Sequence, residues 1–132
     1  MGTINPRGIR NHNPGNIRRS DDDWEGLAPV QRDDSFFQFV NPVYGIRAMA
    51  RILDSYRNRG VDTIKEIIST WAPASENNTA AYVASVVSQT GIGENQYVTR
   101  ADYADLIEAI IRHENGQQPY SRQLINQAIA MA

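Results

Sequence analysis

Apolar residues follow a helical period through most of the chain after Asn41. They recur every three or four residues in five segments, which is the spacing of one face of an α-helix. One apolar stripe on each predicted helix indicates a shared core. The stripes are Ile46, Met49, Leu53 and Tyr56; Ile64, Ile67, Ile68 and Trp71; Tyr82, Val83, Val86 and Val87; Tyr103, Leu106, Ile107, Ile110 and Ile111; and Leu124, Ile125 and Ala128. The residues expected deepest in the core are Ile68, Trp71, Val83, Val86, Leu106 and Ile110.

The boundaries of the five helices are predicted from residues that cap or break helices. Side chains that can accept a hydrogen bond from the first turn open each one. These are Asn41 with Pro42 behind it, Asp62, Asn77 or Asn78, Thr99 with Asp102 in a capping box, and Ser121. Glycine or proline ends the first four helices, at Gly60, Pro73, Gly91 and the pair Asn115-Gly116.

The first forty residues have a different character. Pro, Gly, Asn and Asp are frequent there and no helical period is present, so residues 1–40 are expected to form loops with a small hairpin. Residues 27–30 and 36–40 are the candidate strands. The chain is therefore predicted to be mainly α, with about five helices and a minor hairpin. We expect a single domain over residues 1–132, divided into a loop region (1–40) and a helical region (41–132).

Composition excludes several classes of protein. The chain has 132 residues, of which 41% are hydrophobic and 21% charged, as in a folded globular domain. A net charge of −2 gives no reason to expect a nucleic-acid partner, and no apolar run reaches the ~18 residues of a membrane span. Without cysteine, neither disulfides nor thiol catalysis are available. We expect no signal peptide, no membrane insertion and a monomer.

Glu114 is the leading candidate for catalysis. It stands where the fourth predicted helix ends, in the run IIRHENGQQP. The partial negative charge of a helix C-terminus and the apolar turn before it both favour a protonated carboxyl, which a general acid needs. The alternative is an ordinary glutamate in solvent. Glu76 is the second choice, because a carboxylate near a helix N-terminus is better suited to capping or ligand binding.

Other residue types offer less. The only histidines, His12 and His113, lie far apart in sequence and have no HExxH context, so we expect no metal and no cofactor. Trp24 follows three aspartates in a polar stretch, where an aromatic ring can stack on a sugar; its alternative is a core residue. Tyr120 follows Glu114 in another polar loop and is a further candidate for substrate contact.

The N-terminal run RGIRNHNPGNIR resembles the opening of a family of bacteriophage and prophage proteins. The similarity continues through WEG at residues 24–26, Phe36 and Phe39, GIRA at 45–48, WAP at 71–73 and ENNT at 76–79. Members of this family are described as virion structural proteins or as peptidoglycan-degrading enzymes. The resemblance thus implies bacterial peptidoglycan as the partner, together with other virion proteins.

The segment Glu114-Asn115-Gly116 is similar to the Glu-Ser-Gly that carries the catalytic glutamate of lytic transglycosylases. That resemblance implies a lysozyme-like fold, in which the glutamate ends a buried helix and a hairpin or loop region forms the facing wall. Here the hairpin would precede the helix, so the fold would be a circular permutation or an analogue of that arrangement. A transglycosylase uses one glutamate as acid and then base. Asn13, Asn16 and Arg18 would then hold the acetamido and lactyl groups of the substrate.

The sequence therefore predicts phage-derived cleavage of the peptidoglycan glycan strand, by a lytic transglycosylase or a muramidase. Two alternatives stay open: a virion or wall-binding protein without enzymatic activity, and a wall endopeptidase. The protein is expected in the virion or the host cytoplasm, from where a virion or a membrane pore would bring it to the periplasmic wall.

Overall fold

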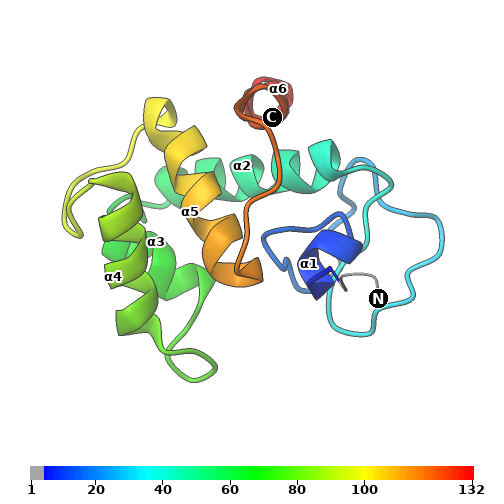
Figure 1. The fold of residues 1–132 in the computed structure, drawn as a ribbon, viewed down its shortest axis with the longest axis horizontal. Helices are drawn as coiled ribbons and strands as arrows, with labels where there is room; N and C mark the ends of the chain where they lie inside the picture. The colour runs from blue at the N-terminus through cyan, green and yellow to red at the C-terminus, as the bar shows by residue number, and fades with distance from the viewer. Residues whose placement is uncertain (1–4) are drawn as a thin grey trace.

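The computed structural model describes residues 5–132, so only residues 1–4 of the predicted loop region lie outside it. The described residues are mainly helical, and the five predicted helices are confirmed (Figure 1). They are α2 (Pro42–Asn58), α3 (Ile64–Trp71), α4 (Thr79–Thr90), α5 (Tyr103–Asn115) and α6 (Arg122–Met131). The sequence pattern missed two short elements: α1 (Arg7–Arg10) and the 3-10 helix η1 (Arg100–Asp102) that leads into α5.

Local capping explains where the long helices begin. The side chains of Asn41, Asn78 and Ser121 each accept a hydrogen bond from the first turn of α2, α4 and α6. The prediction for α3 was wrong by one residue, because Thr63 rather than Asp62 is the cap. Thr63 has Glu66 three residues later, so both members of a capping box are present.

The predicted hairpin is absent from the described residues. Leu27 and Phe39 form an isolated antiparallel bridge, and residues 27–30 and 36–40 extend no ladder from it. Side chains take the backbone partners that a ladder would use: the Gln38 backbone N–H donates to Gln31 Oε1, and the Arg32 N–H donates to Gln38 Oε1. Polar side chains that hydrogen-bond to nearby backbone groups compete with sheet formation. Here they hold the segment as a loop instead of a hairpin.

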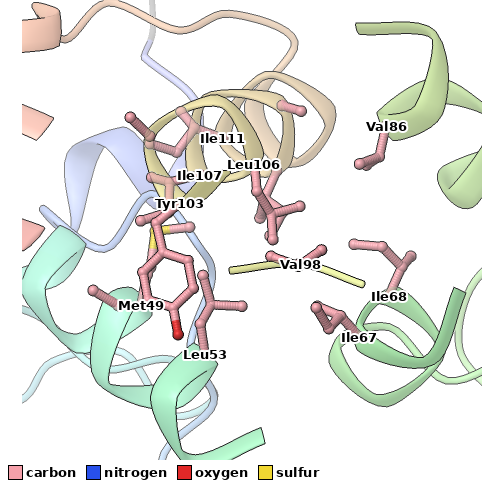
Figure 2. Close-up of a cluster of buried hydrophobic side chains, with 14 of the residues drawn as sticks. Met49, Leu53, Ile67, Ile68, Val86, Val98, Tyr103, Leu106, Ile107 and Ile111 are labelled. Carbon is pink, nitrogen blue, oxygen red and sulfur yellow. The ribbon is translucent and has the colours of Figure 1, made fainter. Parts of the chain in front are cut away.

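Helix α5 runs through the middle of the molecule, with α3 and α4 on one side and the N-terminal loops on the other (Figure 1). Its buried face meets apolar residues of α2, α3 and α4 (Figure 2). Of the six residues predicted deepest in the core, five are buried: Ile68, Val83, Val86, Leu106 and Ile110. Trp71 is only half-buried, because α3 ends there and its ring lies at the edge of the core.

A second, smaller cluster attaches the N-terminal loops to α2. Phe37, Phe39 and Ala48 are buried together, and Ile17 packs against both this cluster and the main core. Gly45 lets the loop approach the helix, because a methyl group there would collide with the carbonyl oxygen of His12. The loops are thereby fixed beside the end of α5. Within residues 5–132, no helix is both long enough and apolar enough to cross a membrane.

Candidate active site

Glu114 lines a groove between the N-terminal loops and the helices. The groove has a volume of about 360 Å³, within the usual range for small-molecule sites. Four parts of the chain form its walls: the loop at residues 15–18 with Phe36; Ile52 and Tyr56 of α2; residues 70–73 with Glu76 and Asn77; and Glu114 of α5. We call this the Glu114 groove. It brings together both carboxylates predicted as candidates.

The Glu114 carboxylate is held from two sides. Asn16 Nδ2 donates to Glu114 Oε1 at 2.8 Å, and the Tyr82 hydroxyl donates to Oε2 at 2.9 Å. The two donors come from the N-terminal loop and from α4, so tertiary structure rather than local sequence fixes the carboxylate. An amide NH₂ can only donate, whereas a hydroxyl can donate or accept. The Tyr82 hydroxyl can therefore donate to Glu114 when the carboxyl group is ionised and accept from it when the group is protonated.

Tyr82 is a rigid partner. Its side chain is 1% exposed and its ring stacks on the ring of His113, with centroids 3.7 Å apart. Burial, together with the nearby charge of Glu114, raises the pKa of Tyr82 well above its usual range. The hydroxyl therefore keeps its proton at every pH at which the protein would work.

The N-terminal motif builds the turn that presents Asn16. Asn13 is fully buried; its amide donates to the carbonyls of Ile17 and Phe37, and its oxygen accepts from the Ile17 N–H. Asn16 has a φ of 50°, in the left-handed region that asparagine adopts more readily than most residues. Asn115 ties the turn to α5, because its amide donates to the Pro14 carbonyl at 2.8 Å. The motif thus shapes one wall of the groove.

Gly8 completes this arrangement by leaving room for two amide oxygens. A methyl group on Gly8 would lie 2.6 Å from Asn115 Oδ1 and 2.8 Å from Asn16 Oδ1. Both oxygens are buried, and neither has a hydrogen-bond partner among residues 5–132. A side chain at position 8 would therefore push on the residue that holds Glu114.

Glu76, the second candidate carboxylate, is bound differently. Its carboxylate lies 3.3 Å from the Arg18 guanidinium, and both side chains are more than half exposed, at 52% and 61%. The Arg18 guanidinium also lies over the ring of Phe36, 5.3 Å from its centroid. An exposed ion pair of this kind contributes little to stability and breaks at little cost, so both charged groups are available to a ligand.

Three of the predicted substrate contacts lie outside the Glu114 groove. The Asn13 side chain is buried and hydrogen-bonded to the backbone through both its NH₂ group and its oxygen, so it does not face a ligand. Trp24 lies in a separate depression beside Arg47 and packs on the smaller cluster. Tyr120 packs against the main core, and burial raises its pKa to about 12. Asn16 and Arg18 are the predicted substrate contacts that the groove contains.

The two histidines have packing roles. His12 Nδ1 lies 3.1 Å from the Phe39 carbonyl oxygen, and His113 stacks on Tyr82. In the described part of the chain, no three His, Asp or Glu side chains lie close enough together to hold a metal ion.

Sequence reasoning missed Tyr82 as a site residue and Trp71 as part of the groove wall. Tyr82 belongs to an apolar stripe, and 32 positions separate it from Glu114, so no local pattern marks its role. For Trp71 a signal was available, since the residue directly precedes the Ala-Pro at which α3 was expected to stop. A large aromatic at a helix end is as suited to a groove wall as to a core.

Comparison with known proteins shows a similarity to a bacteriophage protein. No protein-family model matches the chain. Over an aligned region of 119 residues, the chain is 44% identical to Protein P5 of Pseudoalteromonas phage PM2. This region covers 87% of the chain and 74% of the phage protein.

Proposed function

For this chain, which belongs to the family of Protein P5 of Pseudoalteromonas phage PM2, we propose the function of a phage-derived enzyme that cleaves the glycan strand of bacterial peptidoglycan. Glu114 is its general acid and base. The observation that supports this most is the placement of Glu114 in a groove with each oxygen held by a neutral donor. A general acid has to be held in one orientation within hydrogen-bond reach of the leaving oxygen.

For a lytic transglycosylase this one carboxyl group is enough, whereas a muramidase normally uses a second carboxylate as well. In the first step, Glu114 gives its proton to the glycosidic oxygen as the bond from that oxygen to the anomeric carbon breaks. In the second step, the Glu114 carboxylate takes a proton from the hydroxyl that forms the new bond to the anomeric carbon. That hydroxyl belongs to water in a muramidase, or to the sugar itself in a lytic transglycosylase. The glutamate regains the proton it lost.

The other groove residues suit the substrate. Asn16 can hydrogen-bond an acetamido group, and the Arg18 guanidinium can pair with a lactyl oxygen or a carboxylate once it leaves Glu76. The half-buried Trp71 and Tyr56 rings present apolar surface to the sugar faces. A helix-terminal glutamate facing a loop wall parallels the lysozyme arrangement, and we propose the fold as its analogue or circular permutation. Carried by the virion or by a membrane pore, the enzyme would act on the periplasmic wall.

A binding protein is the second candidate. Both Glu114 oxygens already have partners in the free protein, so the same groove could dock on glycan without cutting it. Such a protein would use Asn16 and Arg18 as described above and would have no need of a proton on Glu114.

The test is digestion of purified peptidoglycan with analysis of the products by mass. Anhydro-sugar ends would identify a lyase, new reducing ends a hydrolase, and free peptide ends an endopeptidase. Glu114→Gln keeps size and shape but has no proton to give, so its rate should fall roughly a hundredfold or more. Glu94→Gln is the matched control, because Glu94 is exposed and lies outside the Glu114 groove.

The outcomes separate the candidates. If Glu114→Gln clears peptidoglycan at the native rate, the acid role is refuted. If the native protein binds peptidoglycan and releases no fragments, the binding protein takes its place. If only Glu76→Gln abolishes cleavage, the reaction class stands and the acid is Glu76.

A further inference from the structure

Arginines lie over two aromatic rings that line the Glu114 groove, Arg7 and Arg18 over Phe36 and Arg59 over Tyr56. Arg18 covers Phe36, and the Arg59 guanidinium lies 5.3 Å from the centroid of the Tyr56 ring. The two rings come from different walls, one from the N-terminal loop and one from α2. A guanidinium stacked on a ring is already partly ordered, so less conformational freedom is lost when it binds an anion.

Arg59 continues the groove wall made by α2. Ile52 and Tyr56 line the groove, and Arg59 follows them at the i, i+4, i+7 spacing of one helix face, in the cap residue just after α2. It also lines a second depression together with Arg51 and Asp54, and the Asp54 carboxylate is paired with Arg100. The positive charge of Arg59 therefore lies beside the groove wall, over the Tyr56 ring.

The charge of Arg59 is not neutralised within the described structure. No carboxylate of residues 5–132 lies within ion-pair distance of it, whereas Arg18 is paired with Glu76 and Arg47 with Glu25. An exposed guanidinium next to a groove that takes a glycan is suited to a carboxylate carried by the same substrate, which it can bind through two parallel N–H donors.

We propose that Arg59 forms an anion-binding subsite for the carboxylates of the peptide stems of peptidoglycan, an inference that rests on the proposed function. In intact strands the N-acetylated sugars are uncharged, because the lactyl carboxyl group is taken up in the amide bond to the stem, so the carboxylates of this polymer lie on the stems. A glycan seated against Tyr56 would bring a stem toward Arg59. The enzyme would then favour strands that still carry stems over bare glycan.

Binding is the direct test, and it is best made in the Glu114→Gln background so that cleavage cannot remove the ligand. Sedimentation with intact sacculi is compared with sedimentation with chitin, a β-1,4-linked polymer of N-acetylglucosamine that carries neither stems nor carboxylates. Adding Arg59→Gln should weaken binding to sacculi about two- to fivefold, the effect of one exposed charge pair. Binding to chitin should not change. Arg59→Lys, which keeps the charge, should restore part of the loss.

Arg112→Gln is the matched control, since it removes the same charge from an exposed residue of α5 that lines a different depression. Equal binding of the Arg59→Gln and Arg112→Gln variants to sacculi would overturn the subsite, as would an equal loss on sacculi and chitin. A selective loss on sacculi supports it even if the native protein cleaves nothing, in which case the proposed reaction fails alone. If the native rate depends on Glu114 but Arg59→Gln binds normally, the reaction stands and the subsite fails.

Discussion

Replacing Tyr82 by phenylalanine isolates the role of one hydrogen bond in the groove. The change removes the hydroxyl that donates to Glu114 Oε2 at 2.9 Å. It leaves the ring, its burial and its stacking on His113 in place. The variant therefore tests whether Glu114 has to be held, separately from whether Tyr82 is needed to fill the core.

The expected magnitude follows from the surroundings of the bond. A hydrogen bond to a charged group contributes roughly 1.5–3 kcal/mol, but water in the groove can replace the lost donor on Glu114. We therefore expect a loss of stability of only about 1 kcal/mol. A carboxyl free to rotate is badly placed for proton transfer, and 1–2 kcal/mol lost in the transition state is about a five- to thirtyfold lower kcat. KM should change little, because the substrate contacts remain.

The assay is the initial rate of fragment release from sacculi over a range of substrate concentrations, with the thermal midpoint measured beside it. Tyr97→Phe is the control, since that side chain is 70% exposed and lies outside the groove. A Tyr82→Phe variant with native kcat and a lowered midpoint would refute the positioning argument and leave Tyr82 a core residue.

Two further substitutions test the N-terminal loops. Gly8→Ala would place a methyl group 2.8 Å from Asn16 Oδ1, so it should lower stability by about 1–3 kcal/mol and also lower kcat through Glu114; native values of both would show that the loop yields freely. The Arg7 guanidinium holds the pKa of Asp33 far below its usual value, so this stabilisation is complete above about pH 4 and is lost as pH falls further toward the folded-state pKa. Asp33→Asn should therefore lower the thermal midpoint at pH 7, and its difference from the native protein should shrink from about pH 4 downward; a difference that stays constant down to pH 2 would contradict this.

Most of the helical fold could be predicted because its signals are local. A stripe such as that of α5 and a cap such as Ser121 lie within one or two turns of the structure they determine. The error at Asp62 arose between two adjacent capping residues, and the partner Glu66 decides in favour of Thr63. The hairpin failed for the opposite reason, since its strand pattern was real but the side chains of Gln31 and Gln38 bond to the backbone instead.

The site was predictable only in part. Glu114 could be selected because a helix end followed by glycine is visible in sequence, and Gly116 does end α5 in the left-handed conformation. Its partners could not be, because the bond from Asn16 spans 98 positions and the bond from Tyr82 spans 32. Asn13 and Asn16 look alike in the sequence motif, yet Asn13 hydrogen-bonds the backbone of the loop and Asn16 lines the groove.

The spacing of Asn16 and Arg18 shows why loop and site are coupled. The two residues flank Ile17 and contact the two carboxylates of the groove, since Asn16 donates to Glu114 and Arg18 pairs with Glu76. Ile17, between them, packs against both apolar clusters and so holds the segment in place against the core. A shift of this segment would remove its contacts with both carboxylates together and leave Tyr82 as the remaining partner of Glu114. The N-terminal motif therefore serves the site through its packing as much as through its polar groups, and substitutions at Ile17 should disturb Glu114 without touching it.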